Sequence, residues 1–445
     1  MRPQVSGISG VAIVAALLVH EGCDRIALCD LDSYRSEDSC AKATVIAPAN
    51  LARKSAGVEL VLQIPGLAAW AMPTVTLTDS KKTAHAYSGS QLNVADDVLR
   101  VVIGDATGLA AGPAEVAFER AGRRRGQAAL CIYTPPVWSD GQKVLTYDPM
   151  DMKTEALQVF IGWHTSAEVP GLFVAEQNAK VGLQRFLNFY VGPVPAASGL
   201  VKVTNSETND GTALFAVTAT SALTYHVDTG SKVVRAIGFR DGATTSVQVS
   251  MPSDPSLFAA SQQGDWAVLA SSSLLQVFDV GALGPKVAGS LPFVFSGSPR
   301  ALAVRPGPFA AGGSNLEATA LNGTKLRLFV RNAGLLKALP DTASTQATDA
   351  LGGLQPVLLD QTDLDGDGTV DVIGGFGDVA TGRVASIGWL ASLSDGSFAP
   401  VELAALKAPV DNVRSMSVGD LNGDGKPDLA LATAGAVYVY FNLAP

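Results

Sequence analysis

Pairs of short apolar segments, each pair joined by a turn, recur along most of the chain and constrain its fold more than any other feature. Six copies begin at residues 171, 212, 265, 316, 370 and 427, so that successive starts lie 41 to 57 residues apart. Strands and turns that repeat at this spacing are typical of a β-propeller with one four-stranded blade per repeat. Separate sandwich domains would need about 90–100 residues each.

We therefore predict an all-β fold in which residues 137–445 form a β-propeller of six to seven blades, with seven favoured. A seventh repeat would lie within residues 137–165 or be completed by the C-terminal strand. The composition agrees with this prediction, because charged residues make up only 16% of the chain and the 45 glycines suit many turns.

A second β-rich segment precedes the repeats. From Val98 to Pro136 apolar and polar residues alternate, with turn signals at GDATG, AAGP and AGRRRG. We predict a small β-sandwich-like domain over residues 44–135, which loosely resembles an immunoglobulin-like module of bacterial surface proteins. The boundary is expected at Pro135-Pro136, because consecutive prolines cannot join a sheet ladder.

The first 22 residues are predicted to be an export signal peptide. Arg2 makes the start positive, and Val5 to Val19 carries no charge, which is too short for a membrane span but suits a signal peptide. Gly22-Cys23 resembles the lipobox of bacterial lipoproteins, which implies lipidation of Cys23. The two residues before Gly22 depart from that pattern, so plain secretion and an unprocessed N-terminus stay open. The location is therefore the cell envelope or the extracellular space.

Residues 23–43 form a linker that contains three of the four cysteines. If Cys23 carries lipid, Cys29 and Cys40 are expected to form a local disulfide in an exported chain. Cys131, inside the apolar run ALCIY, would then be a buried free thiol. If Cys23 is not lipidated, three pairings are possible. No C-x-x-C occurs and the four histidines are scattered, which gives a zinc site no support.

Two nine-residue stretches hold seven aspartates: DLDGDGTVD at 363–371 and DLNGDGKPD at 420–428. Without these seven charges the formal net charge of −9 would be −2, so the acidity is local. A nucleic-acid partner is not expected, since it would require a basic face. The dense basic run from Arg123 to Arg125 is interpreted as a solvated hairpin tip.

Acidic side chains on alternate residues, followed by a glycine bend at position 6, can place several oxygens around one point. That arrangement suits Ca²⁺, which prefers six to eight oxygen ligands, better than Mg²⁺. We predict one structural Ca²⁺ in each stretch, without which the aspartates would repel one another and the loop would be strained. The alternative is a solvated acidic turn without metal. The predicted ligands, with a backbone carbonyl from position 7, are Asp363, Asp365, Asp367, Thr369 and Asp371, and Asp420, Asn422, Asp424, Lys426 and Asp428.

An EF-hand is not supported, because position 12 is Gly374 or Leu431 rather than Glu, and the flanking segments are predicted strands. The pattern D-x-D-x-D-G-x-x-D between strands resembles FG-GAP and VCBS repeats, the calcium-loop blades of integrin-α-like propellers. LSDGSFAPVELAA followed by MSVGDLNGDGKPDLALATAGAVYVYFN is similar to one whole VCBS repeat, and the close resemblance covers residues 356–443. It implies a calcium loop between the first two strands of a blade, with the ligands named above. The earlier repeats lack the aspartates and are expected to be diverged blades.

The function expected from these features is an exported, non-catalytic, calcium-stabilised β-propeller that binds an unknown protein or glycan in adhesion at the cell envelope. Contact with a membrane is expected only through an N-terminal lipid anchor. The alternative is a propeller-type carbohydrate-active enzyme, either a lyase or a glycosidase. No catalytic residue is predicted, since G-x-S-x-G, P-loop and H-E-x-x-H motifs are absent from the sequence. His164 and His226 are interpreted as ordinary strand or turn residues. A role mainly in envelope assembly stays open.

Overall fold

The computed structural model covers the sandwich and propeller regions with gaps. The described residues are 44–47, 50–53, 58–64, 67, 73–110, 112–120, 123–133, 135–147, 154–164, 169–178, 184–191, 201–208, 214–217, 223–228, 233–238, 244–248, 255–260, 266–281, 284–292, 301–308, 315–322, 325–332, 335–339, 341–364, 370–390, 398 and 401–444. The predicted signal peptide, the lipidation site Cys23 and the Cys29–Cys40 disulfide lie outside them, as do Asp365, Asp367 and Thr369.

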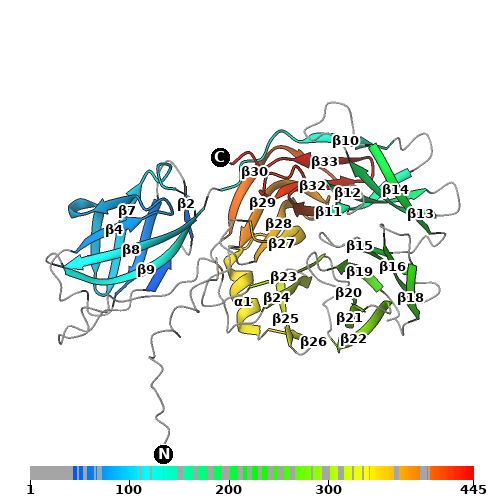
Figure 1. The fold of residues 1–445 in the computed structure, drawn as a ribbon, viewed down its shortest axis with the longest axis horizontal. Coiled ribbons are helices and arrows are strands. Elements are labelled where there is room, and N and C mark those ends of the chain that lie inside the picture. Colours follow the sequence, from blue (N-terminus) through cyan, green and yellow to red (C-terminus); the bar gives the residue numbers. More distant parts are fainter. Residues whose placement is uncertain are drawn as a thin grey trace, which may run out of the picture.

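The N-terminal part is a two-layered sandwich, which lies beside a larger ring of sheets in Figure 1. Alternate residues of its strands point inward, and Leu60, Leu62, Val75, Leu77 and Leu99 belong to one buried cluster between the layers. Its strands pair in the orders β1 (Thr44–Ala47), β3 (Val58–Gln63), β7 (Val98–Gly104), β6 (Leu92–Ala95) and β2 (Asn50–Ala52), β9 (Arg123–Tyr133), β8 (Gly112–Arg120), β4 (Thr74–Thr78), β5 (Ala84–Tyr87). Whether this sandwich is immunoglobulin-like stays a prediction.

The rest of the described chain forms six four-stranded antiparallel sheets. Five of them use four consecutive strands each. These are β11 (Thr154–His164), β12 (Val169–Asn178), β13 (Gln184–Val191) and β14 (Val201–Thr208); β15 (Leu214–Val217), β16 (Leu223–Asp228), β17 (Val233–Gly238) and β18 (Thr244–Gln248); β19 (Pro255–Ala260), β20 (Trp266–Ser271), β21 (Leu274–Gly281) and β22 (Gly284–Pro292); β23 (Ala301–Pro308), β24 (Asn315–Asn322), β25 (Lys325–Asn332) and β26 (Leu335–Ala338); β27 (Pro356–Thr362), β28 (Asp371–Asp378), β29 (Arg383–Leu390) and β30 (Glu402–Val410).

The sixth sheet is built from both ends of this region. The strands β31 (Val413–Gly419), β32 (Asp428–Thr433) and β33 (Ala436–Tyr440) take β10 (Gln142–Thr146) as their fourth member. An isolated bridge between Trp138 and Asn442 continues the pairing. Because β10 is nearly 300 residues from its partner β33, this pairing fastens the start of the region to its end.

The first strands of the six sheets form a closed circle: β11 contacts β15, and so on through β19, β23 and β27 to β31, which contacts β11. Apolar clusters fill the spaces between neighbouring sheets. The predicted propeller is therefore present. The described strands make six such sheets, the lower of the two predicted numbers, because residues 137–165 supply β10 and β11 to sheets already counted.

Polar side chains also connect the first strands. Asp360 of β27 accepts a hydrogen bond from the Val418 N–H of β31 (2.7 Å). Ser417 of β31 accepts one in turn from the Ile161 N–H of β11 (2.9 Å). These bonds satisfy backbone groups that face the next sheet and fix how neighbouring sheets lie against each other.

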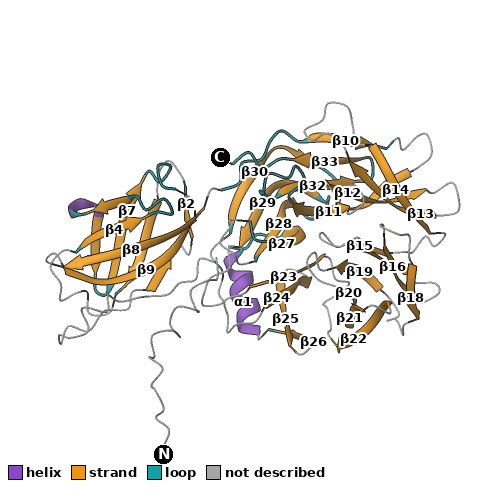
Figure 2. Cartoon of the chain, viewed as in Figure 1, coloured by secondary structure: helices purple, strands orange, loops and turns teal. Residues whose placement is uncertain are grey.

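The helix α1 (Asp341–Ala350) follows β26 and precedes β27 in the chain (Figure 2). The described residues also include a 3-10 turn over Gly89–Gln91 and Leu67 in 3-10 conformation. The sequence analysis did not predict α1. Ala347 of α1 and Leu351, the residue after the helix, are buried against the sheet that contains β25. Within the described residues, no helix is long and apolar enough to cross a bilayer.

Candidate metal centre

The two aspartate stretches occupy equivalent places in neighbouring sheets. Residues 363–370 join β27 to β28, and residues 420–427 join β31 to β32. Each loop therefore connects the first strand of its sheet to the second, as the resemblance implied. In the first loop the structure describes Asp363 and Leu364, whereas the second loop is described throughout.

The last aspartate of each stretch is the first residue of the second strand and is fully buried. Asp371 accepts the N–H of Leu364 at 2.9 Å, and Asp428 accepts the N–H of Leu421 at 3.0 Å. Both leucines are themselves buried, so each anchors the start of its loop in the core. The two loops therefore share one local structure, and the leucine at position 2 belongs to it. These leucines were not predicted as part of the site, although each is the first apolar residue of a polar stretch.

Backbone N–H groups surround the aspartates of the second loop. Asp420 accepts hydrogen bonds from Gly423 (2.7 Å), Asp424 (3.2 Å) and Gly425 (2.8 Å). Asn422 accepts from Asp424 at 2.9 Å, and Asp424 from Lys426 at 2.9 Å. These donors partly offset the repulsion between the carboxylates. The prediction that a cation holds the aspartates together did not include these backbone groups.

Glycine is required at two positions of this loop rather than one. Gly423 and Gly425 have φ angles of 78° and 82°, a region that side chains disfavour. The two reversals turn successive N–H groups toward Asp420. The sharp bend was predicted at position 6, which is Gly425, whereas the loop also bends at position 4, which is Gly423.

Asp428 lies where a negative charge is disfavoured. Burial raises its pKa to about 6, and the nearby Asp424 carboxylate adds to the rise. Hydrogen bonds from the N–H groups of Asn442 (2.9 Å), Leu421 and Asn422 act in the opposite direction. A cation beside Asp424 and Asp428 would relieve both unfavourable effects.

The C-terminal residues complete the second loop. Besides the Asn442 bond to Asp428, the Lys426 ammonium donates to the Ala444 carbonyl. Asn442 is buried, and its side-chain oxygen accepts the N–H groups of Val137 (3.3 Å) and Ala444 (3.1 Å). The sequence gives no local signal for this contact, because Asn442 lies 14 residues beyond Asp428.

The donor set of the second loop fits Ca²⁺ in chemical type, since it offers three carboxylates, an amide oxygen and the Lys426 carbonyl. The side chains as placed face backbone N–H groups, and no three His, Cys, Asp or Glu residues of the described chain gather into a metal-binding group. Ca²⁺ binding therefore requires rotation of Asn422 and Asp424, both of which are exposed. In the first loop only Asp363 and Asp371 can be placed.

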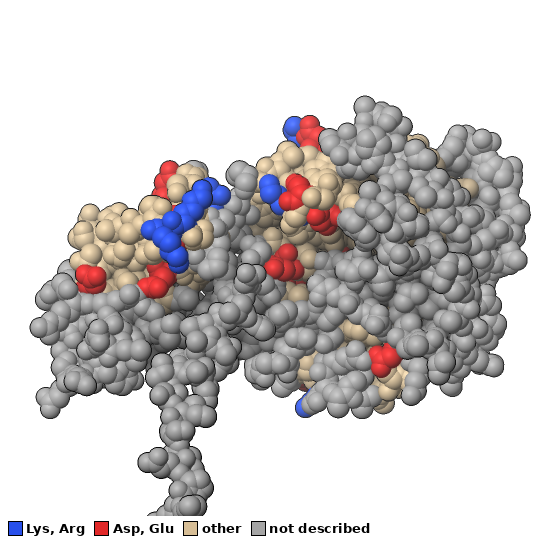
Figure 3. Space-filling model, viewed as in Figure 1, with Lys and Arg blue, Asp and Glu red and all other residues tan. Residues whose placement is uncertain are grey.

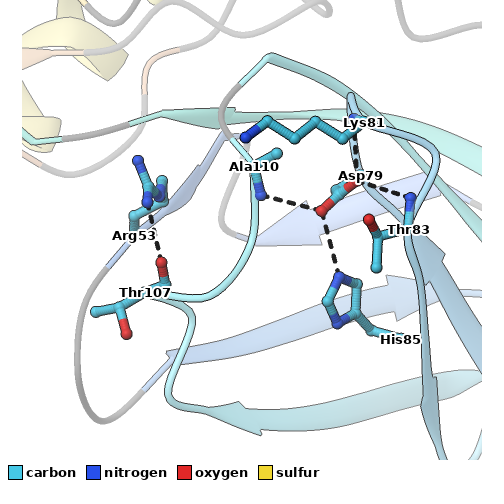
Figure 4. Close-up of polar contacts among 7 residues, drawn as sticks. All are labelled: Arg53, Asp79, Lys81, Thr83, His85, Thr107 and Ala110. Atoms are coloured by element: carbon cyan, nitrogen blue, oxygen red, sulfur yellow. Dashed lines mark hydrogen bonds and ion pairs between the residues drawn. The ribbon is translucent and has the colours of Figure 1, made fainter. Parts of the chain in front are cut away.

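Asp79 is a buried carboxylate of the sandwich, and Figure 4 shows its polar contacts. It was not among the predicted site residues. It accepts the backbone N–H groups of Lys81 (3.0 Å), Thr83 (2.9 Å) and Ala110 (3.1 Å), and its other contact is His85 Nε2 at 3.3 Å. Burial alone would raise its pKa, but these hydrogen bonds outweigh it and lower the pKa to about 2. Asp79 therefore ties the turn after β4 to the loop after β7.

Glu176 of β12 is a second buried carboxylate outside the aspartate loops. It accepts hydrogen bonds from the hydroxyls of Tyr147 (2.8 Å) and Tyr190, and from the Asn188 amide (2.7 Å). Burial and then the Glu176 charge raise the pKa of both tyrosines well above the ordinary value of 10. Tyr147 directly follows β10, so this cluster links the closing strand to the next sheet.

Charged side chains are distributed differently over the two parts of the molecule. On the face shown in Figure 3, Lys and Arg side chains lie in one stripe on the sandwich. On the described surface of the propeller, acidic and basic side chains are interspersed. Exposed ion pairs there include Lys407–Asp140 (2.6 Å) and Arg414–Glu155 (2.9 Å).

Residues 363–431 match the family model of the FG-GAP-like repeat, a segment that contains both aspartate loops. No curated protein matches the chain. Among solved structures, the Myceliophteria thermophila Cps50 (Swd1) β-propeller domain is 11% identical, with 67% of this chain and 99% of that chain covered and a TM-score of 0.34. The RRP9 WD40 repeats are 9% identical (68% and 98% covered, TM-score 0.40). A luciferin-regenerating enzyme is 12% identical (69% and 96% covered, TM-score 0.40).

Proposed function

We propose that this chain is an exported, non-catalytic β-propeller protein in which Ca²⁺ stabilises the last two of the six described blades and the propeller binds a protein or glycan ligand. The observation that carries the calcium part is the equivalence of the two loops. Both join the first and second strands of their sheets, and both end in a fully buried aspartate that holds the loop's leucine N–H. A purely solvated acidic turn would not need this matched burial.

The residues that would hold Ca²⁺ are Asp420, Asn422, Asp424, the Lys426 carbonyl and Asp428, and the corresponding Asp363, Asp365, Asp367, the Thr369 carbonyl and Asp371. When bound, the ion would neutralise the carboxylates and join the two strands of each loop. Such a site is structural, because its ligands are engaged in holding the loop. We expect modest affinity, with a Kd on the order of 10⁻⁴ to 10⁻³ M as in extracellular modules.

Export and lipid attachment at Cys23 belong to the same proposal and rest on the N-terminal sequence. The alternative, a propeller-type carbohydrate-active enzyme, would require a pair of carboxyl groups facing a shared cavity. The buried carboxyl groups of Asp79, Glu176, Asp371 and Asp428 each accept hydrogen bonds from neighbouring donors, Glu176 from side chains and the others from backbone N–H groups, which gives them a structural role. We therefore keep the binding function as the conclusion.

Thermal unfolding in EDTA and in about 10 mM Ca²⁺ tests the calcium part, with Mg²⁺ at the same concentration for comparison. For a Kd on the order of 10⁻⁴ to 10⁻³ M, this concentration would stabilise the folded protein by about 1.4–2.7 kcal/mol per occupied site. We expect Ca²⁺ to raise the Tm of the wild type and not that of the Asp365→Ala/Asp424→Ala double variant.

Asp349→Ala removes one exposed acidic residue of α1 that belongs to neither loop, and should keep the full response to Ca²⁺. An unchanged wild-type Tm, together with no heat of Ca²⁺ binding by calorimetry, would refute the metal assignment.

A further inference from the structure

A cavity of about 510 Å³ opens on the propeller at the ends of strands that begin in the aspartate loops. β28 and β32 start at those loops and end at the turns 379–382 and 434–435, which line the cavity together with residues 411–414. The cavity and the aspartate loops therefore lie on opposite faces of the ring. Its volume falls within the roughly 300–1,000 Å³ typical of small-molecule sites.

Hydrogen bonds between different turns fix the rim of this cavity. The Val413 N–H donates to the Gly382 carbonyl at 2.8 Å, which joins two of the lining turns. The third turn is held from two sides: the backbone N–H of Tyr147, just after β10 of the same sheet, donates to the Gly435 carbonyl (2.8 Å), and the Ala156 N–H of β11 in the neighbouring sheet donates to the Ala434 carbonyl (3.3 Å). The hydroxyl of Tyr147 is in turn fixed by the buried Glu176 (2.8 Å). A ligand would therefore meet a largely preformed surface.

The charges of the cavity are balanced. Asp411 lies 3.6 Å from Arg383, and Arg414 pairs with Glu155 at 2.9 Å. A ligand with a net charge would compete with one of these pairs, whereas a neutral ligand leaves both in place. Arg414 has further N–H donors beyond the one that faces Glu155, and Asp411 offers carboxylate oxygens. A hydroxyl, which donates and accepts, suits both at once.

We propose that this cavity binds a neutral saccharide unit, with Asp411 accepting from ligand hydroxyls and Arg414 donating to them. This choice of glycan over protein rests on the binding role proposed above. The lining residues include no aromatic ring on which a sugar could stack. A few net hydrogen bonds then give a Kd on the order of 1 mM for a single unit.

Saturation-transfer NMR on the full chain tests the proposal, with the methyl glycosides of glucose, galactose, mannose and N-acetylglucosamine each at about 10 mM. Glucuronate and glycine serve as the charged and zwitterionic probes. We expect at least one neutral glycoside to bind, and Asp411→Asn and Arg414→Gln each to weaken it at least fivefold.

Arg100→Gln is the matched control, because it removes an exposed Arg–Glu pair of the sandwich (3.7 Å to Glu59) and should leave binding unchanged. Asp411 and Arg414 are exposed, so both variants should keep the wild-type Tm. The proposal is overturned if no neutral glycoside binds, if only the charged probes bind, or if both cavity variants bind like the wild type. Capture of a protein partner that these variants abolish, without any sugar binding, overturns it as well.

Measurement in Ca²⁺ and in EDTA separates this proposal from the calcium sites. If Ca²⁺ does not change the Tm but the glycoside still binds, the metal assignment is refuted and the saccharide proposal is supported. If Ca²⁺ raises the Tm but no glycoside binds, the saccharide proposal is refuted and the metal assignment is supported.

Discussion

Glu176 allows a quantitative test of how the propeller ring is held closed. Its carboxylate is buried and receives three donors, two of which, the Tyr190 hydroxyl and the Asn188 amide, are buried as well. Glu176→Ala leaves those two donors without an acceptor, at about 1–3 kcal/mol each. The half-buried Tyr147 hydroxyl can turn toward water. Removing the buried charge is favourable, but the cavity that the side chain leaves is unfavourable by a similar amount. We therefore expect the free energy of unfolding to fall by about 4 kcal/mol.

Glu176→Gln separates hydrogen bonding from charge. Among the described residues, the side-chain oxygen of Asn188 is buried without a hydrogen-bond partner. A glutamine can keep one oxygen for the tyrosine hydroxyls while its NH₂ group donates to that oxygen after the Asn188 amide turns over. We therefore expect Glu176→Gln to lie within about 1 kcal/mol of the wild type.

Urea-induced unfolding followed by tryptophan fluorescence measures both variants, because four of the five tryptophans (residues 138, 163, 266 and 389) belong to the propeller region. Glu155→Ala is the control on the neighbouring strand, where the ion pair with Arg414 is exposed and contributes at most about 1 kcal/mol. Near-wild-type stability of Glu176→Ala would refute the reasoning. A loss in Glu176→Gln as large as that in Glu176→Ala would show that the charge itself is needed.

Three further predictions concern other parts of the fold. Gly377→Ala places a Cβ 2.1 Å from the Arg383 carbonyl oxygen, so we expect a loss of about 3 kcal/mol in urea unfolding, against a smaller loss for Gly375→Ala, whose nearest neighbour is a side chain at 3.2 Å. The pKa of Asp79 is lowered to about 2, so its contribution to the stability of the sandwich is present above pH 4 and is lost as the pH falls toward 2. The stability of the sandwich should therefore fall less steeply with falling pH in Asp79→Asn. An unchanged dependence of stability on pH would contradict the structural role of Asp79. Burial and then the charge of Glu176 raise the pKa of the Tyr147 hydroxyl, so the unfolded state loses this proton at a lower pH than the folded state. The free energy of unfolding should therefore fall as the pH rises above 10. Tyr147→Phe should lessen that fall in urea midpoints measured from pH 9 to 12.

Much of the fold is written locally in the sequence. The recurring strand pairs and the all-β class follow from alternation and turn residues. The placement of the aspartate loops between first and second strands was implied by the resemblance to FG-GAP and VCBS repeats. Within the second loop the sequence also indicated Asp420, Asn422, Asp424 and Asp428. It did not indicate how their side chains are used, because Asx-type hydrogen bonds to backbone N–H groups depend on the φ angles of Gly423 and Gly425.

The number of sheets shows the limit of local information. Any exposed strand edge carries unpaired N–H and C=O groups and can pair with another strand. The sequence of β10 therefore does not indicate which strand edge it will pair with. The preference for seven blades arose because residues 137–165 could hold another repeat. The structure instead gives β10 to β33 and thereby completes the sixth sheet.

The repeated β units and the two similar acidic loops could be predicted from the amino-acid sequence, because those features depend on residues within a few positions of each other. The closure of the ring, the buried donors that hold Glu176 and the support that Asn442 gives to Asp428 could be found only in the folded molecule. These contacts join segments far apart along the chain. They form because buried polar groups must find partners wherever packing brings them together.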